Sequence, residues 1–369
     1  MAKSFLRGLA RIVTKPARMV VSRRGIIIQP YRGYGTSKEV FMIGRVMRQP
    51  SQLGAQDKES LVGQLLEIGR WAARRGISKV PLNVRFQGVQ QSLRTDRDGY
   101  FRVRLTPDSA PPPDRSWHDI DIELQKPEVL SASGEIFIPN TPADFVVISD
   151  IDDTIMHTGV ANKIKMVWRL IGKGAESRVA IPGMPSLLRA LYQGPKGQNA
   201  IPMLYVSRAP WAIYEVLDEF FSLNEFPPGP LLFLREWGLT LQSPLPRRSK
   251  NHKAELIKNM LALYHDLPFV LLGDSGQADP EIYHKVVHDN PGRVRAIYIR
   301  DLGDRDTRSQ AIQTLAEEVR AHGATMLLTA NVGEMARHAR DHGLITSAAA
   351  RAVEIEIDGA PAPTPDLVA

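Results

Sequence analysis

Between residues 25 and 140, hydrophobic and polar positions mostly alternate, which is the pattern of half-buried β-strands. The stretches GIIIQPYRGYGT and EVFMIGRVM predict two short strands around a Gly-rich turn. A further stretch, ESLVGQLLEIGRWAARRG, carries apolar residues at helical spacing, and its Gly76 suits a C-terminal cap. We therefore predict a β-rich, sandwich-like domain over 25–140 with one inserted helix. Its later strands are predicted from three alternating runs: Val80, Leu82, Val84 and Phe86; Phe101, Val103 and Leu105; and Ile120, Ile122 and Leu124.

From Pro142 onward the pattern changes to apolar strands that alternate with amphipathic helices. Such alternation is typical of a parallel sheet covered by helices on both faces, so we expect an α/β domain over 141–347. The remaining stretch, 348–369, is rich in Ala and Pro and is predicted to be disordered. The predicted strands are Phe145–Ser149, Pro202–Val206, Leu231–Leu234, Phe269–Leu272, Val294–Ile299 and Ala324–Leu328. The predicted helices are Ala212–Phe221, Ala254–Tyr264, Pro280–His288, Arg308–His322 and Val332–His342.

Composition narrows the class of protein. A length of 369 residues agrees with two domains. A hydrophobic share of 43% with 24% charged residues is that of an ordinary soluble protein, and the sequence has no run of 18 apolar residues that would predict a membrane-spanning helix. The absence of cysteine excludes disulfides, thiolate catalysis and zinc–cysteine sites, and it agrees with a reducing compartment such as the cytoplasm.

The first 24 residues form a basic segment. Nine Lys or Arg and no acidic residue occur between Met1 and Lys38. At helical spacing, Phe5, Leu9 and Ile12 share one face and basic residues share the opposite one, up to Pro16. A helix of this kind can lie peripherally in an anionic membrane surface. A packing helix or solvated tail, or a mitochondrial transit peptide, would carry the same pattern.

The most informative stretch is FVVISDIDDTIMHTGV, in which a buried strand is followed at once by the carboxylates of Asp150, Asp152 and Asp153. In parallel α/β sheets, sites form where the carboxyl ends of strands meet loops. An apolar strand followed by Asp-x-Asp-x-Thr resembles the first motif of haloacid-dehalogenase-type phosphatases. The three further signals of that family follow in order: PMLYVSRAPW ends a strand at Ser207, SKNHKAELIKNML offers Lys253 or Lys250, and FVLLGDSGQADPEIY provides Asp274 and Asp279.

The resemblance implies a Rossmann-like haloacid-dehalogenase-type fold and a role for each motif residue. Asp150 would be the nucleophile that forms an aspartyl-phosphate, and Asp152 would act as general acid and base. Ser207 would hydrogen-bond a phosphoryl oxygen, and Lys253 would offset negative charge. Mg²⁺ would be held by Asp150, Asp152 through its backbone carbonyl, Asp274 and Asp279. Thr154 and Arg208 are candidate substrate contacts, although Thr154 also suits a role in bracing the turn.

Several longer motifs narrow the resemblance to phosphatidate phosphatases of the actin-patch-associated type. These motifs are DIDDTI, PGM at 182–184, YVSRAPW, LREWG, NHK, GDSGQADPEIY and AIYIRD. The β-rich part, with PYRGYG and GRV, also resembles bacterial members of this family. Such enzymes require Mg²⁺ and convert phosphatidate to diacylglycerol and phosphate. One departure concerns the substrate: Arg208-Ala209 follows Ser207, where the fungal enzymes usually carry small polar residues.

The resemblance therefore implies an Mg²⁺-dependent phosphatase that acts on a phosphorylated lipid at a membrane surface. The stretch 160–182 is the predicted small cap, which would leave the site open to a large substrate. Two alternatives remain open at this point. One is a phosphatase for another bulky phosphomonoester, such as a phosphoprotein or a nucleic-acid end, although no nucleic-acid-binding motif is present. The other is a membrane-associated scaffold with an inactive phosphatase fold.

Overall fold

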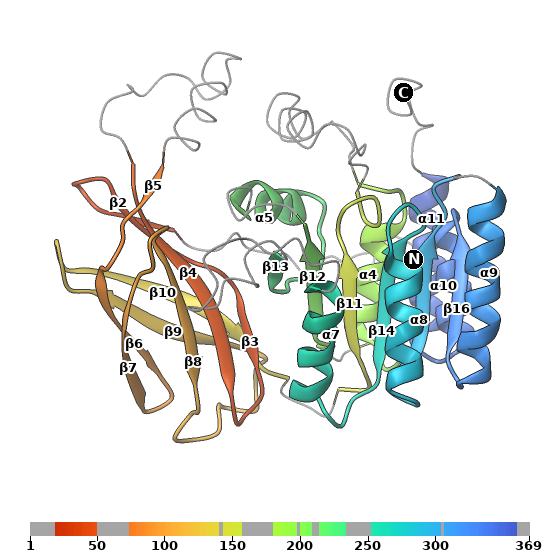
Figure 1. The fold of residues 1–369 in the computed structure, drawn as a ribbon, viewed down its shortest axis with the longest axis horizontal. Coiled ribbons are helices and arrows are strands. Elements are labelled where there is room, and N and C mark those ends of the chain that lie inside the picture. The colour runs from red at the N-terminus through yellow and green to blue at the C-terminus, as the bar shows by residue number, and fades with distance from the viewer. Residues whose placement is uncertain are drawn as a thin grey trace, which may run out of the picture.

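The computed structural model describes residues 19–49, 74–139, 143–156, 180–197, 200–208, 214–233, 252–303 and 306–359. It is a mixed α/β structure with a ten-stranded sheet and a six-stranded parallel sheet (Figure 1). Most of the basic N-terminal segment, most of the predicted inserted helix and most of the predicted cap lie outside the described residues. Among the described helices, none combines the length and the apolar character that crossing a bilayer requires.

The ten-stranded sheet is formed by the first part of the chain, as the alternating pattern predicts. Backbone pairing joins its strands in the order β1-β2-β4-β3-β10-β9-β6-β7, with β5 and β8 also paired to β4. Alternate residues of β4, β6, β8 and β9 face one apolar core. The strands are β1 (Val20–Val21), β2 (Ile26–Pro30), β3 (Gly33–Gly35), β4 (Val40–Arg48), β5 (Arg75–Gly76), β6 (Pro81–Phe86), β7 (Val89–Arg94), β8 (Tyr100–Leu105), β9 (Trp117–Leu124) and β10 (Leu130–Phe137).

Two details of this part differ from the sequence-based expectation. The strands that enclose the core are bonded into one continuous sheet, because the short strand β3 pairs with both β4 and β10. Gly76 is not a helix cap: it lies in β5, where a Cβ would come within 1.9 Å of the Asp98 carbonyl oxygen. The absence of a side chain at Gly76 therefore allows close approach of two backbone segments.

The six-stranded sheet is parallel throughout, and all six strands predicted from the second part of the chain are confirmed, with small shifts at their ends. Their order is β13-β12-β11-β14-β15-β16, so the chain first runs outward from β11 and then returns to its other side at β14. In open α/β sheets, ligands bind at such a reversal, outside the carboxyl ends of the strands. The strands are β11 (Val146–Asp150), β12 (Met203–Ser207), β13 (Leu231–Phe233), β14 (Phe269–Asp274), β15 (Val294–Arg300) and β16 (Thr325–Thr329).

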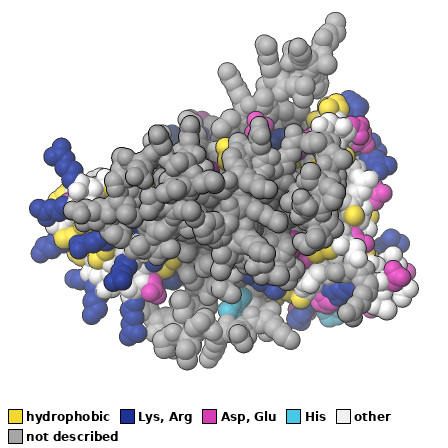
Figure 2. Space-filling view, turned by 90° about the horizontal axis from the view of Figure 1, so that it is seen from above, with side chains coloured by type: hydrophobic (Ala, Val, Ile, Leu, Met, Phe, Trp, Pro, Cys, Tyr) yellow, Lys and Arg dark blue, Asp and Glu magenta, His cyan; other side chains and the backbone are white. Residues whose placement is uncertain are grey.

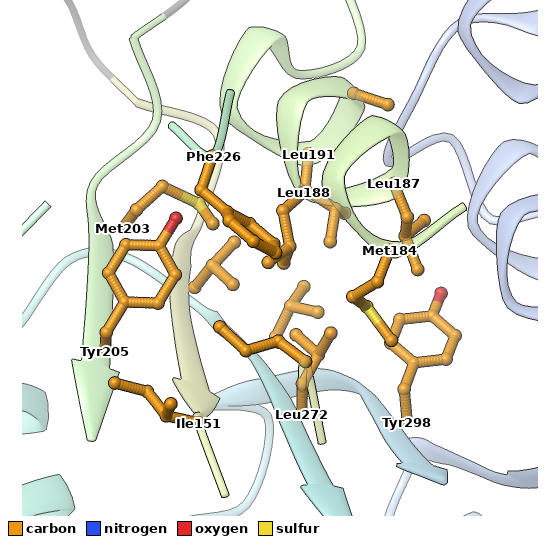
Figure 3. Packing of buried hydrophobic residues seen from close by; sticks show 14 of the residues in the cluster. Ile151, Met184, Leu187, Leu188, Leu191, Met203, Tyr205, Phe226, Leu272 and Tyr298 are labelled. Atoms are coloured by element: carbon orange, nitrogen blue, oxygen red, sulfur yellow. The ribbon is translucent and has the colours of Figure 1, made fainter. Parts of the chain in front are cut away.

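Helices cover both faces of the parallel sheet (Figure 1). Successive side chains of a strand point to opposite faces, so Val147 joins the core beneath α4, α5, α10 and α11, and Val146 and Ile148 join the core beneath α7, α8 and α9. Figure 3 shows the first of these cores, where leucines of α4 pack over strand residues such as Met203 and Leu272. The helices are α4 (Met184–Gln193), α5 (Tyr214–Leu223), α7 (His252–Leu263), α8 (Asp279–Asp289), α9 (Asp306–Ala321), α10 (Val332–Asp341) and α11 (Ser347–Asp358).

Helix α11 corrects the prediction of a disordered tail from residue 348. Thr346 caps this helix by accepting a hydrogen bond from the Ala349 backbone N–H at 3.1 Å. Ala349 and Val353, one turn apart, are buried in the core beneath α4 and α10. The alanines that suggested a low-complexity tail instead favour helix formation, and their small side chains give α11 a narrow packing face. The last ten residues lie outside the described part of the chain.

The segment PYRGYG joins the ten-stranded sheet to the helices of the parallel sheet. The Tyr31 ring lies 4.2 Å from the ring of Tyr214 on α5, measured between centroids. Tyr34 is buried in the core beneath α7. Arg32 donates from Nη1 to Asp218 on α5, and each of these two side chains is 4% exposed. A buried charge is tolerated when an opposite charge is paired with it, so Arg32 and Asp218 depend on each other.

Replacing Arg32 by Met should lower the free energy of unfolding by about 3–5 kcal/mol, because the buried Asp218 carboxylate would lose its ion pair with Arg32. The measurement is chemical or thermal unfolding. Arg104→Met is the control, since Arg104 forms an exposed ion pair with Glu39 whose loss should cost less than about 1 kcal/mol. The double variant Arg32→Met/Asp218→Leu should regain much of the loss. An Arg32→Met protein as stable as Arg104→Met would contradict this account.

Candidate active site

Three of the predicted site residues end neighbouring strands at one edge of the parallel sheet. Asp150 ends β11, Ser207 ends β12 and Asp274 ends β14, with β11 between the other two. All three side chains are buried. Parallel strands bring their carboxyl ends to the same edge, so residues far apart in the sequence meet there. The edge coincides with the reversal of strand order between β11 and β14.

Lys253 lies between two carboxylates. Its Nζ is 2.6 Å from Asp150 Oδ1 and 2.5 Å from Asp279 Oδ1, and the three side chains are at most 1% exposed. Burial acts to lower the pKa of Lys253, but the charges of Asp150 and Asp279 raise it well above its ordinary value. The ammonium group therefore stays protonated, as the predicted charge-offsetting role requires. The competing candidate, Lys250, lies outside the described residues.

Asp279 reaches this position because Gly273 has no side chain. Asp279 begins α8, and its Oδ2 lies 3.4 Å from the Asp274 backbone N–H nitrogen. A Cβ built on Gly273 would lie 2.4 Å from Asp279 Oδ2 and 2.7 Å from Asp279 Cβ. Real Cβ atoms do not come so close, so any side chain at position 273 must displace Asp279.

Gly273→Ala should therefore weaken divalent-metal binding by about tenfold or more, since a shifted Asp279 leaves the carboxylate cluster. The measurement is calorimetric titration of the purified protein with Mg²⁺ or Mn²⁺. Gly359→Ala is the matched control: at this position a Cβ would meet its nearest neighbour at 3.3 Å and the backbone has negative φ. Equal metal affinity of the two variants would show that Asp279 does not need the space at Gly273.

The carboxylates of Asp150, Asp274 and Asp279 form a group suited to a metal ion. One oxygen of each lies within 4.8 Å of the others, and all three residues are buried. Burial raises the pKa of Asp274 to about 6, and the neighbouring Asp279 adds to the rise. Burial likewise raises the pKa of Asp150, with Lys253 opposing the rise. Three carboxylates face one ammonium group, so the cluster is short of positive charge, and hard oxygen donors are what Mg²⁺ prefers.

The carboxylate of Asp152 lies apart from that cluster. Its Oδ2 accepts a hydrogen bond from Ser207 Oγ at 3.2 Å, and the backbone carbonyl of Asp152 faces Gln277 Nε2 at 3.5 Å. The structure thus brings Asp152 and Ser207 together, as an acid–base group and a phosphate-binding hydroxyl would need. A metal contact by Asp152 would use its carbonyl, which is how the sequence-based prediction assigned it.

The two candidate substrate contacts differ in exposure. Thr154 is buried, and its Oγ1 lies 3.5 Å from Asp150 Oδ2, so it braces the turn against the nucleophile candidate. Arg208 directly follows Ser207 and is exposed, so its guanidinium is free to reach an anionic group outside the site. Of these two residues, Arg208 is the one with an exposed side chain.

Gln277 and Arg300 also lie at this edge, and of the two only Arg300 is singled out by the sequence: it follows a strand on the same side as the site, where it could attract an anionic substrate or pair with Asp301. Gln277 donates from Nε2 to Asp274 Oδ2 at 2.8 Å and so orients that carboxylate. Arg300 ends β15 beside Asp274 and donates from Nη1 to the Asp153 carbonyl at 2.8 Å. Gln277 stands between the two acids of GDSGQAD, so its position alone could have marked it. Their partners could not be read from the sequence.

Comparisons with known proteins identify what this chain is similar to. Residues 145–301 match the family model described as phosphatidate phosphatase APP1, catalytic domain. The chain is 30% identical over 212 residues to Phosphatidate phosphatase APP1 of Saccharomyces cerevisiae, a match that covers 56% of this chain and 34% of that protein. It is 28% identical over 156 residues to an uncharacterized protein of Schizosaccharomyces pombe, covering 42% of this chain and 25% of the relative. The chain thus spans about a third or less of the curated relatives.

Among solved structures, a carbohydrate acetylesterase from Xanthomonas citri aligns with 81% of this chain and 66% of its own, at 9% identity and a TM-score of 0.31. That similarity is too low to inform fold or function.

Proposed function

We propose, on the premise that residues 145–301 form a catalytic domain of the phosphatidate phosphatase APP1 family, that this chain is a metal-dependent phosphatase whose substrate is phosphatidate. The observation that carries the proposal is the buried cluster at the end of β11. There a carboxylate, Asp150, is paired with Lys253 beside two further carboxylates, and Asp152 is hydrogen-bonded to Ser207. We assign the α/β part to the haloacid-dehalogenase type on the same grounds.

In the proposed reaction, a carboxylate oxygen of Asp150 attacks phosphorus and forms an aspartyl-phosphate. The bond between phosphorus and the diacylglycerol oxygen breaks, and Asp152 gives its proton to that oxygen. Asp152 then takes a proton from a water molecule, which attacks the phosphorus of the aspartyl-phosphate. Inorganic phosphate leaves, and Asp150 regains its carboxylate.

The other residues bind the phosphoryl group and neutralise its charge. Ser207 donates a hydrogen bond from its hydroxyl group to a phosphoryl oxygen, and Lys253 offsets the charge shared by the phosphoryl group and Asp150. Asp150, Asp274, Asp279 and the Asp152 carbonyl would hold Mg²⁺, which when bound supplies further neutralisation of the phosphoryl oxygens. Arg208 would bind an anionic part of the substrate or of the surface that carries it.

A membrane-held substrate is supported by the charge distribution. The protein has a formal net charge of +7, and its first 38 residues carry basic groups without acidic ones. Dark blue Lys and Arg side chains also surround the end formed by the ten-stranded sheet, at the left of Figure 2. Several arginines of this sheet are exposed, including Arg48, Arg75 and Arg94. Such groups attract anionic lipid head groups at short range.

The test of the reaction is phosphate release in the presence of Mg²⁺ from phosphatidate in mixed micelles. Soluble phosphomonoesters and phosphopeptides are assayed beside it at equal phosphate concentration. We expect the highest kcat/KM with phosphatidate and loss of activity when the metal is chelated. Preference for a phosphopeptide would identify a different bulky substrate. Failure to hydrolyse any ester would indicate an inactive scaffold and refute the proposal.

Membrane contact is tested separately by removing residues 1–24 and measuring sedimentation with anionic vesicles. We expect weaker binding of the shortened chain, with the difference shrinking as salt is added, because the attraction is electrostatic. Unchanged sedimentation of the shortened chain would show that its basic segment is not the membrane contact.

A further inference from the structure

The turn that carries Asp152 has an unusual backbone. Asp153 adopts a left-handed conformation with φ of 59°, which side-chain-bearing residues adopt seldom, Asp and Asn more readily than most. The turn is closed by hydrogen bonds from the Asp153 N–H to the Met156 carbonyl at 3.0 Å and from the Ile155 N–H to the Ile151 carbonyl at 3.2 Å. The direction of the Asp152 side chain depends on this turn, since a change at Asp153 rotates the backbone that precedes it.

Arg300 reaches this turn from another strand. It ends β15, is paired in register with Asp274 on β14, and extends past the end of β14 to the segment that follows β11. Its Nη1 donates to the Asp153 carbonyl at 2.8 Å. The side chain is partly buried, and its Nε makes no hydrogen bond to any described residue. Burial lowers the pKa of Arg300, although the nearby Asp153 and Asp274 oppose this effect.

Partial burial of a guanidinium group costs solvation free energy. The hydrogen bond from Arg300 to the Asp153 carbonyl should therefore contribute to the conformation of the turn. Arg300 does not form an ion pair with its neighbour Asp301 among the interactions of the described residues; Asp301 instead accepts from the Gly303 N–H. Arg300 contacts a carbonyl oxygen within the turn that carries Asp152, and not a carboxylate that would merely balance its charge. Gln277 Nε2 faces the preceding carbonyl, that of Asp152, at 3.5 Å.

We propose that Arg300 is a positioning residue for the phosphatase reaction: by binding the Asp153 carbonyl it holds the turn that directs the Asp152 carboxylate toward Ser207 and the leaving oxygen of the substrate. This inference rests on the proposed function. Without the contact, the turn relaxes from its left-handed conformation, and Asp152 moves away from the position at which it gives and takes a proton. General acid–base catalysis depends on such placement, and a shift of about 1 Å can cost about 10²-fold in rate.

The experiment compares three variants of the full chain. Arg300→Met removes every donor with little change of volume, and Arg300→Lys restores one donor. Arg293→Met is the matched control, because Arg293 immediately precedes β15 at the other end of that strand, is likewise partly buried with an unbonded Nε, and donates to the carbonyls of Leu261, Tyr264 and Leu267. If Arg300→Met does not fold, Arg300→Gln replaces it.

Two readouts are measured. The first is steady-state kinetics: we expect Arg300→Met to lower kcat by about 10- to 100-fold with KM changed less than threefold, and Arg300→Lys to recover at least a third of the wild-type kcat. The second is amide hydrogen exchange of the peptide spanning 150–156. We expect it to be faster in Arg300→Met than in the wild type, and unchanged in Arg293→Met even if that variant is less stable overall.

Either of two results would overturn the proposal. Unchanged exchange of the 150–156 peptide in Arg300→Met would show that the arginine does not hold the turn. A raised KM with wild-type kcat would show that Arg300 contacts the substrate. Failure of the wild type to release phosphate from any ester would refute the proposed function instead, and hydrogen exchange would still decide whether Arg300 holds the turn.

Discussion

Replacing Asp150 by Asn should abolish phosphate release, with kcat lowered by roughly 10⁴- to 10⁶-fold, the range found when a catalytic nucleophile is removed. The carboxamide keeps the shape of the carboxylate but cannot form the aspartyl-phosphate. Asp150 ends the central strand and is fully buried against Lys253. The measurement is phosphate release from phosphatidate under single-turnover and steady-state conditions.

The matched control for this prediction is Asp153→Asn. It makes the same chemical change three residues later, at a left-handed position that Asn also tolerates. Because no chemical step is assigned to Asp153, this variant should keep kcat within about threefold of the wild type. If Asp150→Asn kept more than a tenth of the wild-type rate, the aspartyl-phosphate mechanism would be wrong.

Replacing Lys253 by Met should remove activity and also destabilise the fold, by about 3–5 kcal/mol, because Asp150 and Asp279 would lose the cation to which both are bonded. Added Mg²⁺ should raise the unfolding midpoint of this variant more than that of the wild type, since a divalent cation would offset part of the missing charge. The measurement is thermal unfolding with and without Mg²⁺.

Lys258→Met is the control for Lys253, because it lies on the same helix and is exposed. It should be close to the wild type in stability and activity. A Lys253→Met protein with wild-type stability would mean that the two carboxylates are satisfied by other groups, and the charge balance described for the site would have to be revised.

Much of the parallel sheet could be predicted because its strands are continuous apolar runs, such as Phe145–Ser149, that end in polar residues. The meeting of Asp150, Ser207 and Asp274 at one edge then follows from parallel topology. Which contacts each carboxylate makes could not be predicted in this way. Whether Asp152 joins the metal cluster or bonds Ser207 depends on a left-handed turn at Asp153 and on the contact of that turn with Arg300.

The differences between the predicted and the observed fold have similar causes. The sequence pattern does not indicate helix α11, because its apolar face is narrow and consists largely of alanines. Its stability depends on the core beneath α4 and α10 and not on a strong periodic pattern. The continuous bonding of the ten-stranded sheet depends on β3, a three-residue strand that pairs with β10, about a hundred residues later. Pairing at such sequence separation leaves no local signal.

The contact of PYRGYG with α5 and with the core beneath α7 limits how this protein can be divided into fragments. The catalytic family model begins at residue 145. The residues that form this contact lie more than a hundred residues earlier; they are Tyr31, Arg32 and Tyr34. A fragment that started at residue 145 would lose the packing of Tyr31 on Tyr214 and the ion pair of Arg32 with Asp218. The smallest piece suitable for expression, crystallisation or directed evolution should therefore begin before Gly25, and evolutionary loss of the ten-stranded sheet would require compensating changes on α5.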